Sequence, residues 1–272
     1  MRDFPATPVD MVVSLWRHRG LIHATATREV LGRYRGSALG LLWSFLNPLF
    51  MLAVYTFVFS EVFKARWRVG SESKTEFAFV LFAGLIVFNL FAECINRAPS
   101  LILSNPNYVK KVVFPLEILP FVGLLCAGYH MLISIGVWLV AYAILVGLPP
   151  VTVLLLPLVI LPFALFIMGL SWALASLGVF LRDVSQFISL VVTTLMFLSP
   201  IFYPASSMPD IYRQILFINP LTPVIEMTRD VLYWGKPPEI MMLCTYWLTT
   251  SIIAWLGFAW FQKTRKGFAD VM

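Results

Sequence analysis

Charged residues are scarce in this sequence. Only 12% of the 272 residues are charged, whereas 60% are apolar. A soluble domain typically has about 25% charged residues. One globular core could not bury so much apolar surface, so the composition predicts a membrane protein. The formal net charge of +6 does not indicate a nucleic-acid partner, because the basic residues stand at the ends of apolar runs, where they anchor spans.

Residue patterns for catalysis or metal binding are also missing. The sequence has no G-x-x-x-x-G-K-[ST] loop to hold a nucleotide phosphate and no H-E-x-x-H motif. The three cysteines have no paired spacing, which argues against a disulfide framework and a metal site. Gly169-Leu170-Ser171 resembles part of an intramembrane protease turn, but the nucleophile pattern is incomplete. We therefore expect no catalytic residue, metal or cofactor in this chain.

Charges are nearly absent from the apolar runs themselves. Residues 118–181 contain none, and Glu93 and Arg97 stand near a run's end, at a spacing that allows them to pair. His130 could relay protons, but a lone histidine inside a span more often bonds a neighbouring helix. The sequence thus offers no internal energy source, and energy for uphill transport would come from another subunit.

Apolar runs long enough to cross a bilayer predict an all-α integral membrane protein with six transmembrane helices. Cytoplasmic loops carry an excess of Lys and Arg. Thirteen of the 20 lie on the side of both termini, which are therefore expected in the cytoplasm. The predicted parts are a gate segment at 1–36, a transmembrane domain at 37–262 with spans near 37–60, 77–96, 119–147, 155–180, 184–202 and 240–262, and a tail at 263–272.

The first 36 residues predict an amphipathic helix at the membrane interface. Val9, Val12, Val13 and Trp16 recur at helical spacing beside basic residues. A solvated cytoplasmic helix is the alternative. Gly20 is expected to bend the chain. Further on, Gly32, Gly36 and Gly40 would share one helical face, which favours close helix packing.

Two connections contain more than loop residues. On the cytoplasmic side, Asn105 and Pro106 predict the start of a short helix over 106–114, which would either couple to a soluble partner or serve as an ordinary basic connector. On the outer side, residues 204–239 predict two short amphipathic helices. These would either re-enter between the spans or lie on the membrane surface.

Several aromatic residues lie deep within the predicted spans. Trp138 and three others occur away from span boundaries. Their rings could stack on sugars while their polar tips bond hydroxyl groups, although most such rings pack in the core or face lipid. The candidates for lining a path are Tyr55, Tyr142 and Trp172.

An ordered set of short motifs extends over nearly the whole chain. They are Tyr34-Arg35-Gly36-Ser37-x-Leu39-Gly40-x-x-Trp43, Asn47-Pro48, Asn105-Pro106, Lys110-Lys111, Phe114-Pro115, Arg182-Asp183-Val184, Ser199-Pro200 and Asn219-Pro220-Leu221-Thr222-Pro223. In this order the set resembles the ABC-2 type transporter permeases, in particular those that export O-antigen, capsule or teichoic acid chains.

The resemblance implies a homodimer in the bacterial inner membrane, with two ATP-binding cassette subunits that bind ATP and magnesium. It also implies a glycan on polyprenyl diphosphate as cargo, with an exporter of a drug or lipid as the alternative; a membrane scaffold or an intramembrane hydrolase is the alternative of another class. The implied sites are an ATPase-coupling set (Asn107, Tyr108, Lys110, Lys111 and Phe114) and a gate or diphosphate set (Arg28, Arg33, Tyr34 and Arg35).

Overall fold

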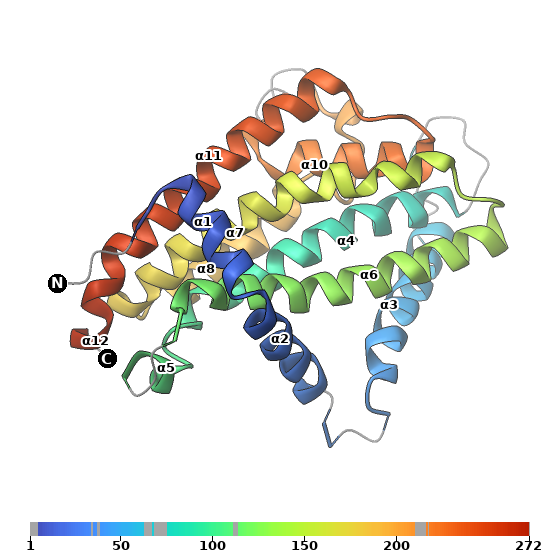
Figure 1. Cartoon of the computed structure of the whole chain (residues 1–272). Coiled ribbons are helices and arrows are strands. Elements are labelled where there is room, and N and C mark those ends of the chain that lie inside the picture. Colours follow the sequence, from blue (N-terminus) through green and yellow to red (C-terminus); the bar gives the residue numbers. More distant parts are fainter. Residues whose placement is uncertain are drawn as a thin grey trace.

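The computed structural model describes residues 5–33, 35–36, 39–62, 67, 75–110, 114–209, 216 and 218–271. All regular elements within these residues are helices, as the composition predicted. Different connections lie at the two ends of the bundle. The short helices α5 (Pro106–Lys110) and α12 (Phe268–Val271) lie at one end, and the connection at 146–150 lies at the other (Figure 1). This arrangement agrees with the predicted topology, while the side that faces the cytoplasm stays a prediction.

Five helical segments are long and apolar enough to span a membrane. They are built on α3 (Leu42–Tyr55), α4 (Glu76–Arg97), α6 (Leu119–Leu145), α7 (Leu156–Phe180) and α11 (Ile240–Thr264), with short flanking helical turns.

The fifth predicted span, near 184–202, is shorter than expected. Helix α8 (Val184–Leu198) has 15 residues, which gives a length of about 22 Å against a hydrocarbon thickness of about 30 Å. It ends at Leu198 because Ser199, the residue before Pro200, has an extended backbone. Six complete crossings therefore stay a prediction.

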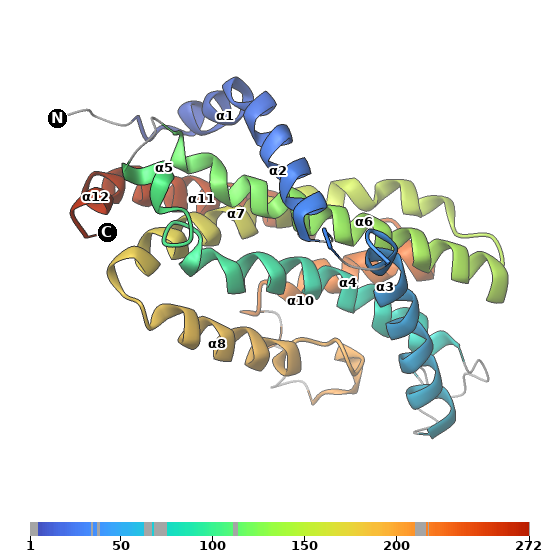
Figure 2. The ribbon, with the colours of Figure 1, turned by 90° about the horizontal axis from the view of Figure 1, so that it is seen from below.

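Helix α4 lies at the centre of the bundle. In its most apolar stretch, 83% of the residues are buried, against 11% for α3. Helices α6, α7 and α10 (Leu221–Arg229) pack against α4, and α3 and α8 contact it from the periphery of the bundle (Figure 2). The apolar side chains of α3 and α8 remain largely exposed in the single chain.

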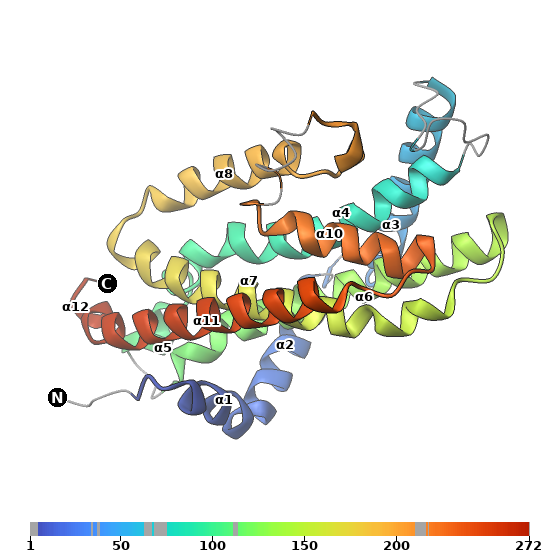
Figure 3. The ribbon, with the colours of Figure 1, turned by 90° about the horizontal axis from the view of Figure 1, so that it is seen from above.

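Helix α11 runs along α7 (Figure 3), and two glycines allow their backbones to touch. A Cβ atom on Gly257 would lie 2.0 Å from the carbonyl oxygen of Gly169, and a Cβ on Gly169 would lie 2.5 Å from that of Ile253. Close helix packing thus explains Gly169 without a protease turn. The predicted glycine face was wrong, because Gly36 and Gly40 have positive φ angles of 85° and 51° in the turns before α3.

The N-terminal segment forms two helices. Helix α1 (Pro8–Arg17) begins at a capping box between Thr7 and Asp10, and α2 (Arg19–Arg33) follows. The break falls at His18, so the predicted bend at Gly20 was wrong. The four residues of the predicted apolar face, Val9, Val12, Val13 and Trp16, are all exposed, as an interfacial helix requires.

The segment predicted to lie on the outer side places a charged residue in the interior. The guanidinium of Arg229, at the end of α10, is fully buried. It donates hydrogen bonds to the carbonyls of Val80, Pro200 and Ile201 and to Glu226 Oε1, at 2.6–3.1 Å. The sequence count treated Arg229 as a loop cation. The predicted helix beginning near Thr222 is confirmed as α10, but most of the other predicted helix lies outside the described residues.

The glycine contact predicts the effect of a single methyl group. Gly257→Ala should lower the free energy of unfolding by about 2 kcal/mol, because the methyl group would overlap the backbone of Gly169. Thermal unfolding in detergent measures this loss. Gly136→Ala on α6 is the control, since a Cβ there meets no atom within 4 Å. Equal stability of the two variants would contradict the packing argument.

The buried guanidinium predicts a larger effect. Arg229→Met should destabilise the protein by about 3–5 kcal/mol, because it leaves buried carbonyl groups unpaired. Lys236→Met, an exposed change seven residues beyond Arg229, leaves those bonds intact and serves as the control. Thermal unfolding and protease cleavage of the outer segment should both separate the variants. Matching curves would show that the Arg229 bonds contribute little.

Candidate functional site

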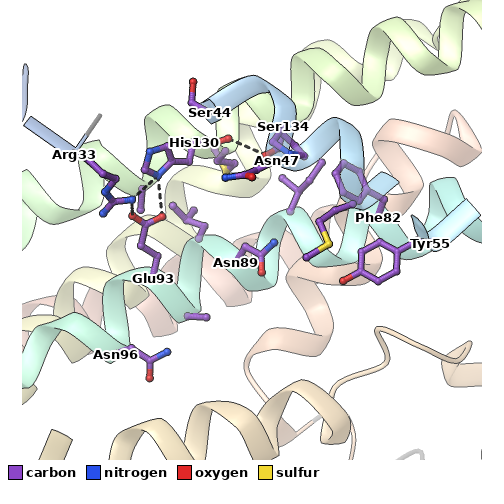
Figure 4. A pocket seen from close by; sticks show the side chains of 17 residues that line it. Arg33, Ser44, Asn47, Tyr55, Phe82, Asn89, Glu93, Asn96, His130 and Ser134 are labelled. Atoms are coloured by element: carbon purple, nitrogen blue, oxygen red, sulfur yellow. Dashed lines mark hydrogen bonds and ion pairs between the residues drawn. The ribbon is translucent and has the colours of Figure 1, made fainter. Parts of the chain in front are cut away.

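A cavity of about 570 Å³ lies between the end of α2 and helices α3, α4 and α6 (Figure 4). It follows α4 from Phe82 to Asn96, which is about 21 Å along the helix axis. Arg33 lies at one end of the cavity, and Tyr55 lies near Phe82 at the other (Figure 4). Its polar lining residues are Arg33, Ser44, Asn47, Asn89, Glu93, Asn96, His130 and Ser134.

Three ionisable side chains meet at one end of this cavity. Arg33 Nη1 donates to Glu93 Oε1 at 2.6 Å, and Nδ1 of His130 lies 3.0 Å from Glu93 Oε2. Glu93 therefore joins α2, α4 and α6, which confirms that His130 bonds a neighbouring helix. The expected pairing of Glu93 with Arg97 was wrong, because Arg97 forms an ion pair with Glu29 of α2.

A polar stripe marks the cavity face of α4. Asn89, Glu93 and Asn96 share one side of this otherwise apolar helix. Both asparagines are exposed, and neither amide has a hydrogen-bond partner among the described residues. Unpaired polar groups are costly at membrane depth, so this face is suited to water or a polar ligand. The spacing 89, 93, 96 within an apolar run could have revealed the stripe in the sequence.

The predicted gate set divides between two positions. Arg33 lines the cavity, whereas Arg28 and Arg35 lie beside a second, shallow hollow along α2. Arg28 Nη2 also donates to the hydroxyl of Tyr108 at 3.0 Å. Tyr34 lies outside the described residues. Any phosphate that binds Arg33 would compete with Glu93 for the same guanidinium.

The described residues of the predicted coupling set lie within α5 or shortly after it. The ring of Tyr108 stacks on Phe114, with centroids 4.1 Å apart and an interplanar angle of 6°. Asn107 is exposed. The side chain of Lys110 and all of Lys111 lie outside what the structure describes, so helix can be assigned only over Pro106–Lys110 of the predicted 106–114.

The candidate path-lining rings occupy different environments. Tyr55 lines the cavity. Trp172 is buried and donates from Nε1 to the carbonyl of Glu117 at 2.8 Å, and Tyr142 is buried against Trp138, with ring centroids 4.8 Å apart. These contacts correct the expectation for Tyr142 and Trp172, because both rings are engaged in packing within this conformation.

Comparison with known proteins now defines the class of the chain. The family model for ABC-2 type transporters matches residues 20–233, so the chain belongs to the ABC-2 transporter family. As in that family, this chain is a transport subunit with several apolar helices.

Particular relatives extend over nearly the whole chain. An O-antigen export system permease protein RfbA of Myxococcus xanthus is 28% identical over 264 residues, which is 96% of this chain and 99% of the relative. Two O-antigen export system permease proteins RfbA of Klebsiella pneumoniae are 26% and 28% identical, each over 93% of this chain and 95% of the relative.

The ion pair at the cavity predicts how α2 is held. Glu93→Gln should loosen α2 and speed backbone hydrogen exchange there by up to about fivefold, because a partly exposed ion pair contributes up to about 1 kcal/mol. Hydrogen exchange followed by mass spectrometry measures this change. Asp183→Asn, an exposed acid before α8, should leave exchange in α2 unchanged. Unaltered α2 exchange in Glu93→Gln would contradict this role.

Proposed function

We propose that this chain is the permease subunit of an ATP-driven exporter that carries a lipid-linked, O-antigen-like polysaccharide across the bacterial inner membrane. The main support is the polar stripe of α4, whose two asparagine amides have no hydrogen-bond partner among the described residues and which provides a hydrophilic wall inside an apolar bundle. The full-length similarity to O-antigen permeases supports the same cargo.

The chemistry of the cavity suits a glycan with an anionic anchor. Amide and hydroxyl groups of Asn89, Asn96 and Ser134 can exchange hydrogen bonds with sugar hydroxyls, and the ring of Tyr55 can stack on an apolar sugar face. Arg33 offers a guanidinium that matches phosphate geometry. A diphosphate would enter at this end by displacing the carboxylate of Glu93.

The complete transporter would contain two copies of this chain and two ATP-binding cassette subunits. The partner subunits would bind ATP and magnesium, and this chain would provide the two conformations that their nucleotide cycle biases. The exposed apolar faces of α3 and α8 leave surface for lipid or a second copy. In this arrangement α8, together with the following residues 199–202, provides the crossing that the five long spans leave out.

Deletion of the gene in its own bacterium tests this function. Polysaccharide on the cell surface should disappear, and its lipid-linked form should accumulate inside the inner membrane. Intact surface polysaccharide together with lost resistance to a drug would instead support an exporter of another cargo.

A substitution in the stripe tests the path itself. Asn89→Leu should reduce export by about fivefold at equal expression, because one polar contact contributes about 1 kcal/mol. Thr245→Val on α11 removes an exposed hydroxyl away from the cavity and is the matched control. Full export by Asn89→Leu would place the path elsewhere.

A further inference from the structure

We propose that the hydrogen bond between Arg28 and Tyr108 transmits movement of α5 to α2, and through α2 to the wall of the cavity. This inference rests on the proposed function, because it takes α5 as the contact for the ATPase. Tyr108 and Arg28 then act as positioning residues, and neither needs to touch the cargo.

The segment that follows α5 is fixed to the bundle. Arg265, after α11, donates from Nη2 to the carbonyl of Phe114 at 3.0 Å and from Nη1 to Glu117 Oε2 at 2.6 Å. The other oxygen of Glu117 accepts a hydrogen bond from Ser14 of α1 at 3.0 Å. Because Trp172 of α7 also bonds the Glu117 carbonyl, residues 114–117 are held by three other elements.

Tyr108 of α5 connects this fixed segment to α2. Phe114 is buried and provides a platform for the ring of Tyr108, so the stack sets the direction of the tyrosine hydroxyl. That hydroxyl accepts the hydrogen bond from Arg28. When α5 pivots about the fixed Phe114 end, the displaced hydroxyl draws Arg28 with it.

Helix α2 is built to respond to such a displacement. Its buried residues are Ile22 and Ala26, Val30 packs partly buried against the same core, and polar contacts also hold its inner face. Glu29 pairs with Arg97 of α4, and Arg33 pairs with Glu93. An element with few buried apolar contacts has a low free-energy cost of local movement.

The route ends at the cavity. Arg28 and Arg33 are about 7.5 Å apart along the axis of α2. A displacement of α2 as a rigid body therefore moves Arg33 relative to Glu93. Helix α2 is therefore in equilibrium between two positions. Movement of α5 shifts this equilibrium through Arg28, and an anion bound at Arg33 shifts it through the other end of the helix.

The test uses the full chain in complex with its ATPase, reconstituted in proteoliposomes. Tyr108→Phe removes the hydroxyl but keeps the ring that stacks on Phe114. We expect polysaccharide export per ATP hydrolysed to be lowered about tenfold, as for the loss of a hydrogen bond to a charged group. Arg28→Met should behave alike, and the double variant should be no worse than either single one.

Tyr203→Phe is the matched control, because it removes a tyrosine hydroxyl whose partner among the described residues is the carbonyl of Phe197. Normal export per ATP by Tyr108→Phe would overturn the inference. A parallel loss of ATPase binding and hydrolysis would also overturn it, since Tyr108 would then serve in docking alone.

A second readout does not depend on cargo. A fluorophore is attached to Thr27→Cys on α2 in a Cys244→Ser background, where the remaining cysteines, Cys94 and Cys126, are buried. ATP should change its emission in the parent complex but not in the Tyr108→Phe variant. An ATP response that persists without the hydroxyl overturns the link. A parent complex that shows the response but exports no polysaccharide contradicts only the proposed function.

Discussion

The buried guanidinium of Arg229 determines how the central helix is oriented. Its bonds to the carbonyls of Val80, Pro200 and Ile201 join α4, the end of α8 and α10. Gly84 makes room for it, because a Cβ there would lie 2.9 Å from Nη2. At 3.6 residues per turn, Gly84 is between about 120° and 180° around α4 from Asn89, Glu93 and Asn96 of the stripe. The contact that holds α4 against α10 therefore turns its polar face toward the cavity.

The apolar spans and their order could be predicted because hydropathy and length are local properties of the sequence. Five spans, the start of α5 and the presence of α10 followed from that information. Helix boundaries were harder to predict where the backbone conformation of a single residue sets them. Ser199, which precedes Pro200, has an extended backbone and ends α8. Two glycines with positive φ similarly displaced the start of α3 from residue 37 to Leu42.

The candidate site was predictable only in part. Arg33 and Tyr55 were both proposed from the sequence, but nothing local indicated that they line one cavity. Helical spacing predicted that Glu93 pairs with Arg97. In the structure Glu93 pairs with Arg33 and Arg97 pairs with Glu29, and both partners belong to α2. Such partners are far apart in the sequence, and only the packing of α2 against the bundle brings them together.

The two kinds of arginine contact explain which parts can move. Removing a partner from a buried charge costs about 3–5 kcal/mol, whereas an exposed ion pair contributes about 0.2–1 kcal/mol. The side chain of Arg229 is 0% exposed and that of Arg33 is 41% exposed. We therefore expect a buried contact such as that of Arg229 to persist through a transport cycle. An exposed ion pair such as that of Arg33 can break and re-form within the cycle. Hence α10 and α4 can serve as the fixed frame, against which α2 changes position beside the cavity.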